Sequence, residues 1–229
     1  MKLPVRLAAI LGLVTIWGPT VAWFSGTAHA QAPDHGSHAA PTALFTQESA
    51  VGIAHAMTLG ATVFLAGLVA FATLVWLPAS RGEDADQEKA VGLLCRWMWV
   101  LVGVIVVAGL IELPLYAVRA SGDTLSLGLL GEALFDTRVG QLWIERLAFG
   151  ILTAAAATYA ARPQRPAYRW VAALVASALL LTTLTRQSHA AAEGGFLPLA
   201  ADWLHLTAAS LWMGGLLGFP ILLVGPLRA

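Results

Sequence analysis

The chain has 229 residues, of which 58% are hydrophobic and 11% are charged, whereas an ordinary soluble domain is about 25% charged. Its 13 basic residues balance 13 acidic ones, so the basic excess typical of a nucleic-acid-binding protein is absent. Disorder and a soluble globule are both incompatible with this apolar content, and the single cysteine excludes an internal disulfide, so we expect a membrane protein whose main partner is the lipid bilayer.

The first 30 residues have the pattern of an export signal. Lys2 and Arg6 precede a short apolar stretch over residues 7–17, and Ala28-His29-Ala30 matches a cleavage site. The alternative is an uncleaved extra helix. Both interpretations leave the following segment on the outer side of the membrane.

Residues 31–48 are polar and contain Pro33 and Pro41, which indicates a flexible tether rather than a folded unit. This tether carries His35 and His38. We expect these two side chains to capture a metal ion loosely, because neutral imidazole is the commonest metal ligand in proteins.

Five continuous apolar segments follow, each near or above the roughly 20 residues that cross the hydrocarbon as a helix. They cover residues 50–78, 92–117, 141–160, 168–186 and 200–225. Because the runs do not alternate, a membrane barrel is excluded. The sequence therefore predicts an all-α, polytopic transmembrane helix bundle of about five spans over residues 49–229, after the signal sequence.

The loops indicate the orientation of this bundle. With residue 50 outside, seven basic residues fall on the cytoplasmic side and four on the outer side, as the positive-inside rule expects. The outer loop near 124–137 mixes leucines with Glu132 and Asp136, which favours a short helix lying in the membrane interface. Glu145 and Arg146 are predicted to pair with a neighbouring helix, whereas Arg186 is predicted to extend to the headgroups.

Intramembrane polar residues gather at the outer ends of the five segments. Such residues are expensive in lipid and are functional candidates by default. The layer consists of His55, Glu112, Glu145, Arg146, Arg186, His189, Asp202 and His205.

Three histidines of this layer, His55, His189 and His205, are the predicted metal ligands, because imidazole suits copper well. Asp202 precedes His205 by three residues, so both lie on one helix face and the carboxylate can orient an imidazole ring. Glu112 is a second candidate for that role, and Trp212 is expected to form the wall below the site.

The last segment also carries a stripe of small residues, Ser210, Gly214 and Gly218, at intervals of four. Such a stripe allows close helix contact. Because both faces of this helix favour protein neighbours and the chain stops at Ala229, the sequence indicates either a homo-oligomer or a second membrane subunit, or else an incomplete version of a longer protein.

Two stretches resemble the copper resistance protein D (CopD) family of bacterial inner-membrane proteins. One runs from Ser188-His189-Ala190-Ala191-Ala192 to the pattern Asp-x-x-His-Leu and Trp-x-Gly-Gly over residues 201–216. The other is Thr-Arg-Val-Gly-Gln-Leu-Trp over residues 137–143, with Arg146. The similarity covers about residues 45–229, although family members usually continue for several more helices.

The resemblance implies a copper-binding inner-membrane protein that moves copper inward from the periplasm or confers copper resistance. It makes His189 and His205 the motif histidines, with Asp202, Trp212 and the two glycines of the motif, Gly214 and Gly215. It also implies a copper ion as cargo, a multi-pass chain with a periplasmic mature N-terminus, and a periplasmic copper-binding protein as partner.

Two other functions stay open. A haem-bearing electron-transfer protein would use His55 and His205 as axial ligands, and a non-transporting assembly subunit would pair through the small-residue stripe. An enzyme is not expected, because no Ser/His/Asp or paired-carboxylate arrangement has local motif support.

Overall fold

A computed structural model of the chain describes residues 47–80, 84–162 and 167–224. The predicted signal sequence and most of the tether, with His35 and His38, lie outside the described residues. The helices, in chain order, are α2 (Gln47–Phe71), η2 (Ala72–Trp76), α3 (Leu77–Ala79), α4 (Asp84–Ser121), α5 (Leu127–Phe135), α6 (Arg138–Ala160), η3 (Ala167–Arg169), α7 (Trp170–Thr185), α8 (His189–Glu193) and α9 (Phe196–Val224).

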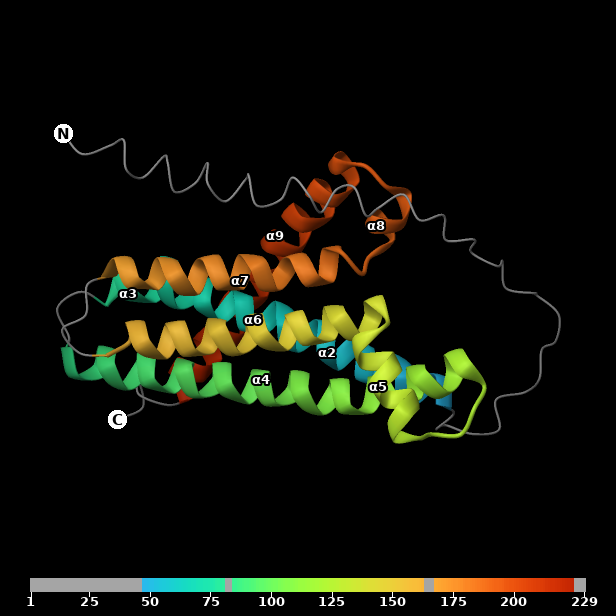
Figure 1. The fold of residues 1–229 in the computed structure, drawn as a ribbon. Helices are drawn as coiled ribbons and strands as arrows, with labels where there is room; N and C mark the ends of the chain where they lie inside the picture. Colours follow the sequence, from blue (N-terminus) through green and yellow to red (C-terminus); the bar gives the residue numbers. More distant parts are fainter. Residues whose placement is uncertain (1–46, 81–83, 163–166, 225–229) are drawn as a thin grey trace.

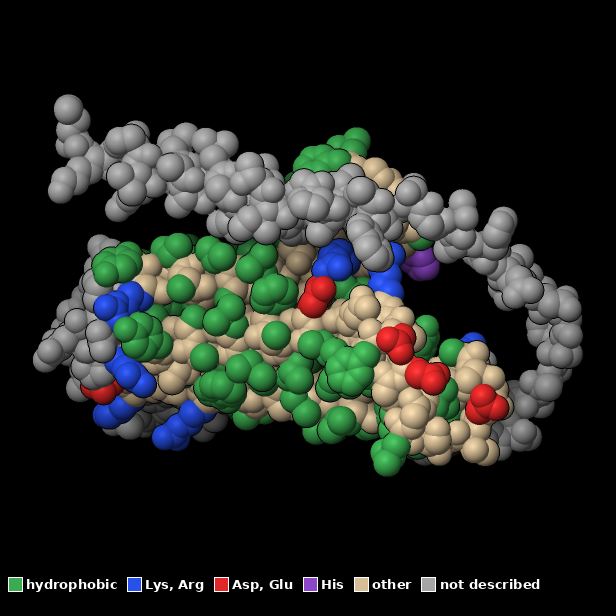
Figure 2. Space-filling model, viewed as in Figure 1, with side chains coloured by type: hydrophobic (Ala, Val, Ile, Leu, Met, Phe, Trp, Pro, Cys, Tyr) green, Lys and Arg blue, Asp and Glu red, His purple; other side chains and the backbone are tan. Residues whose placement is uncertain are grey.

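The long helices form a bundle in which α2, α4, α6 and α7 lie side by side, and α9 crosses them obliquely (Figure 1). We call the end where α2 and α6 begin and α4 and α7 finish the His55 end. At the opposite end α6 finishes and α7 begins, and Lys and Arg side chains gather there (Figure 2). Arg96, Arg162 and Arg169 belong to the helices and turns of that end, in agreement with the charge asymmetry read from the sequence.

Three stretches of the described chain are long and apolar enough to span a membrane: Ser49–Ala79, Gln87–Ser121 and Phe196–Leu223. The fold is therefore the helical membrane bundle expected from the sequence. Of the five expected segments, the fourth is the apolar but shorter helix Trp170–Thr185. The third is α6, whose 23 residues include three charged side chains, Arg138, Glu145 and Arg146.

Helix α2 is the centre of the bundle, since it packs against α4, α6, α7 and α9. Its residues Leu65, Leu68 and Val69 are completely buried. They join a core that contains Leu94, Met98 and Ile105 of α4, Ala154 and Ala157 of α6, and Leu180 of α7. Close packing of this kind holds each helix in one rotation about its axis, so polar side chains at the His55 end are also held in defined directions.

The small-residue stripe of α9 packs against α2 of the same chain. A Cβ atom added to Gly214 would lie 2.1 Å from the carbonyl oxygen of Gly67, and one added to Gly218 would lie 2.3 Å from the ring of Phe71. The stripe therefore serves close contact between two helices of one chain, and an assembly of several chains would need a different surface.

Short helix α5 lies within the range predicted for an interfacial helix. The hydroxyl of Ser126 caps its first turn by accepting a hydrogen bond from the backbone N–H of Leu129 at 3.2 Å. Its buried residue Ala133 packs against Leu113 and Ala117 of α4. Helix α5 thus connects the end of α4 to the beginning of α6 at the His55 end.

Candidate functional site

The central contact of the candidate site joins α2 to α4. His55 Nδ1 lies 2.8 Å from Glu112 Oε1, and the side chains are 39% and 13% exposed respectively. Because a carboxylate accepts hydrogen bonds, the imidazole donates its Nδ1–H to Glu112. When the ring is neutral, this arrangement leaves the lone pair on Nε2 free for a metal ion.

A second side chain of α2 supports the carboxylate from the buried side. Thr58 is completely buried, and its hydroxyl lies 3.3 Å from Glu112 Oε2 and 3.0 Å from the carbonyl oxygen of Ala54. His55 and Thr58 are three residues apart and therefore lie on the same face of α2. Glu112 thus accepts a hydrogen bond from His55 on one carboxylate oxygen. Its other oxygen shares the single hydrogen of the Thr58 hydroxyl with the carbonyl oxygen of Ala54.

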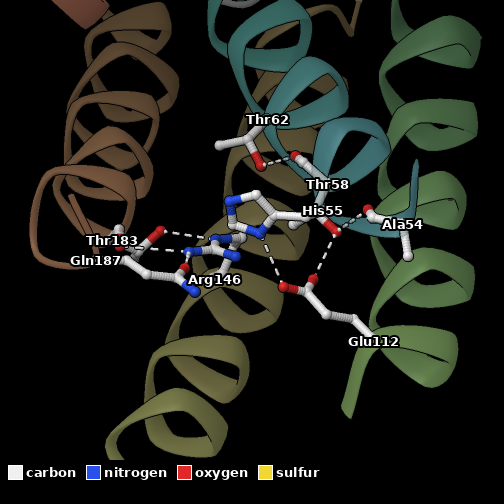
Figure 3. A network of polar contacts seen from close by, with 8 residues as sticks. All are labelled: Ala54, His55, Thr58, Thr62, Glu112, Arg146, Thr183 and Gln187. Atoms are coloured by element: carbon white, nitrogen blue, oxygen red, sulfur yellow. Dashed lines mark hydrogen bonds and ion pairs between the residues drawn. The ribbon is translucent and has the colours of Figure 1, made fainter. Parts of the chain in front are cut away.

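Arg146 of α6 extends the network to α7 (Figure 3). The residue is only 2% exposed. Its guanidinium donates to the Thr183 hydroxyl at 3.2 Å, the Thr183 carbonyl oxygen at 3.3 Å and Gln187 Oε1 at 2.6 Å. It also acts electrostatically on His55 and Glu112. The site therefore combines an imidazole, a carboxylate and a fixed cation from three different helices.

A separate ion pair lies nearer the surface of the same end. Glu145 of α6 pairs with Arg186, the residue that follows α7, and Arg138 donates to the carbonyl oxygen of Arg186 at 2.8 Å. The prediction that Glu145 and Arg146 pair with a neighbouring helix is confirmed, with α7 as that helix. Arg186 was expected to reach the headgroups. The structure pairs it with Glu145 and leaves its side chain 34% exposed, so contact with the headgroups stays a prediction.

The other two predicted histidine ligands are not part of the His55 network. His189 begins the short helix α8, His205 lies on α9, and both are exposed. Across the described ranges, no group of three or more His, Cys, Asp or Glu side chains is arranged to hold a metal ion. His55, His189 and His205 are therefore not gathered around one point in this structure, and their role as ligands stays a prediction.

Two further residues assigned to the predicted site have different surroundings from those expected. Asp202 Oδ2 is buried but has no hydrogen-bond partner in the described part of the chain. Trp212 is 69% exposed and faces away from the bundle, because two residues along a helix turn the side chain by about 200° from Ser210, which faces α2. Trp212 therefore does not form a wall within this bundle.

Sequence reasoning missed three members of the network, Thr58, Thr183 and Gln187. Thr58 had a visible signal, since it follows His55 by three residues in an apolar segment. The end of the 168–186 segment has one too, because Thr182, Thr183 and Thr185 are hydroxyl-bearing side chains close together. Neither signal identifies a partner, which only the packing of α6 against α7 and of α2 against α4 provides.

A bundle of long apolar helices of this kind is a polytopic membrane protein, and this one carries a partly buried histidine–carboxylate–arginine network at one end. The chain belongs to the copper resistance protein D-like family. Residues 46–199 match the model of that family's N-terminal domain. The match includes the His-Ala-Ala stretch, whereas the segment from Asp202 to Gly215 lies beyond it.

A relative of known description is the copper transport protein CutJ of Bacillus subtilis (strain 168). The two are 32% identical over 147 residues, which is 60% of this chain and 27% of CutJ. The chain thus spans about a quarter of the length of that relative. No solved structure matches the chain. These findings make the chain a copper-related membrane protein.

Proposed function

We propose that this protein binds copper at the His55 end of the bundle and passes it inward across the bacterial inner membrane. The observation that carries the proposal is the contact between His55 and Glu112. A histidine whose Nδ1–H is held by a carboxylate has its Nε2 oriented and made more basic for a metal. In a family associated with copper, an intramembrane residue pair of this type is a candidate for cargo binding.

We propose that the remaining histidines form a path that leads to this pair. His189 and His205 are exposed on α8 and α9, which supports a role in receiving an ion at the surface of the bundle. We propose that they receive copper before His55 does, and that His35 and His38 of the tether capture it first from the periplasm or from a periplasmic copper-binding protein. Asp202, with a buried oxygen that has no hydrogen-bond partner among the described residues, would balance charge near His205.

The proposal is tested by copper accumulation in cells that express the chain at equal levels. His55→Ala, His189→Ala and His205→Ala should each lower accumulation toward that of cells without the protein. Tyr168→Ala is the control, because Tyr168 is 68% exposed and lies at the opposite end. Unchanged accumulation in all three histidine variants would overturn the proposal.

The two alternative functions have simple tests. A haem protein would show a Soret band when purified, and a colourless protein would remove that alternative. An assembly subunit without transport would leave copper accumulation independent of its histidines. For the copper-binding function and for both alternatives, we propose that the protein is not an enzyme.

A further inference from the structure

We propose that Arg146 determines which copper charge state the His55 site accepts, by restricting the site to monovalent soft cations. The inference rests on the proposed function, since it names the substrate class of the same site. It concerns a residue that neither the family match nor the sequence motifs assign to cargo. The argument depends on where the guanidinium makes its hydrogen bonds and on the net charge that results.

Arg146 makes its hydrogen bonds to the end of α7 and to Gln187, which follows that helix. All three of its hydrogen bonds in the structure go to neutral acceptors, the hydroxyl and carbonyl oxygens of Thr183 and the amide oxygen of Gln187. The adjacent carboxylate of Glu145 is taken by Arg186. The cation is therefore fixed and buried, and no described carboxylate neutralises it by direct contact.

Glu112, in turn, is engaged by α2. Its two oxygens contact His55 Nδ1 and the Thr58 hydroxyl, while its charge and that of Arg146 act on each other through space. The two fixed charges sum to zero. Next to neutral His55, the site is thus an imidazole nitrogen in surroundings without net charge.

Such a site favours one kind of metal ion. A divalent ion loses far more hydration than a monovalent ion when it leaves water, and carboxylates normally compensate for this loss. Here Arg146 cancels the attraction that Glu112 would supply. A soft monovalent ion such as Cu(I) needs little compensation and binds readily to imidazole. Without Arg146, the same site would be an imidazole–carboxylate pair with a net negative charge, which suits divalent zinc or Cu(II).

The experiment measures Ag(I) and Zn(II) affinity of the purified full chain in lipid nanodiscs, because both ions are redox-inert probes of charge. The wild-type protein should prefer Ag(I). In Arg146→Gln, the ratio of Ag(I) to Zn(II) affinity should fall by about tenfold or more, since a full charge is removed close to the ion. Arg146→Lys should largely retain the wild-type ratio.

Arg138→Gln is the matched control. Arg138 belongs to the same helix and the same end but is exposed, so its removal should leave the ratio unchanged. Circular dichroism checks that each variant is folded. If Arg146→Gln does not fold, Glu112→Gln serves in its place, and it should shift the ratio further toward Ag(I).

The outcomes separate this inference from the proposed function. Wild-type protein that binds neither Ag(I) nor Cu(I) would contradict the proposed function itself. Binding of Ag(I) with a ratio that neither Arg146→Gln nor Glu112→Gln changes would overturn the role of Arg146 alone. A change in affinity for both ions by the same factor would also overturn it, since a purely structural residue would have that effect.

Discussion

Gly67 of α2 and Gly214 of α9 meet at the point where the two helices cross. A Cβ atom on Gly67 would lie 2.2 Å from the carbonyl oxygen of Ser210 and 2.8 Å from Gly214 Cα, and one on Gly214 would lie 2.6 Å from Gly67 Cα. Two backbones approach this closely only where side chains are absent. The crossing fixes α9, and with it His205 and Asp202, relative to the helix that carries His55.

The crossing predicts a sharp contrast between adjacent glycines. Gly214→Ala should destabilise the protein by about 1–3 kcal/mol or more, because the added methyl group meets backbone that cannot rotate away. Gly215→Ala is the matched control, since a Cβ atom there meets nothing within 4 Å. Thermal unfolding in detergent measures both. Equal stability of the two variants would show that the helices do not cross as described.

A second tight contact joins α4 to α6. A Cβ atom on Gly109 would lie 1.5 Å from Trp143 Nε1, so Gly109→Ala must displace the indole. We expect a loss of about 1–3 kcal/mol for an overpacked core of this kind. Gly103 lies six residues earlier on the same helix, and a Cβ atom there would meet nothing within 4 Å. Gly103→Ala should therefore be neutral or slightly stabilising, because alanine favours helix. Fluorescence of the tryptophans and thermal unfolding report on the two changes.

These contacts also show what the sequence could predict. Continuous apolar segments with few charges predicted an all-helical membrane bundle, because only helices satisfy the backbone in lipid over such lengths. The stripe of Ser210, Gly214 and Gly218 predicted close helix contact. Its partner could not be predicted, since Gly67 is one of many glycines in apolar segments and nothing local marks it as the complement.

The end of the bundle that carries the candidate site could be predicted from the sequence, but its contacts only in part. His55, Glu112 and Arg146 fall at corresponding ends of the predicted segments, and the structure has all three at one end of the bundle (Figure 3). Which side chains touch depends on helix rotation, and rotation is set by apolar packing between helices that are distant in sequence. For the same reason Trp212, expected beside the site, faces outward once α9 places its stripe against α2.

Arg146 and Arg186, which join α6 to the end of α7, should differ strongly in their effect on stability. Arg146→Met removes three hydrogen bonds from acceptors on buried Thr183 and half-buried Gln187, which should cost about 2–4 kcal/mol. Arg186→Met breaks an ion pair whose side chains are 34% and 37% exposed, and such a pair contributes about 0–1 kcal/mol. Chemical denaturation in detergent compares the variants. A larger loss of stability for Arg186→Met than for Arg146→Met would contradict the conclusion that the buried Arg146 contributes more to the packing of α6 against α7.

The role of Thr58 can be separated from its packing by a comparison within α2. Thr58→Val keeps the volume of the side chain but removes the hydroxyl that contacts Glu112 at 3.3 Å, so the carboxylate should orient His55 less well. Thr62→Val is the matched control, since Thr62 is equally buried and its hydroxyl bonds only the carbonyl oxygen of Thr58 at 2.7 Å. Thr62→Val should cost about 1 kcal/mol or less, because it removes a neutral hydrogen bond to a carbonyl oxygen that keeps its helical donor. Thr58→Val should cost about 1–3 kcal/mol, because Glu112 Oε2 loses a hydrogen bond that is not replaced by the one from His55, which is on Oε1. Copper accumulation should fall in Thr58→Val, less than in His55→Ala, and stay at the wild-type level in Thr62→Val. Equal accumulation in the two valine variants, with His55→Ala still defective, would mean that copper binding needs the imidazole but not the carboxylate that Thr58 supports.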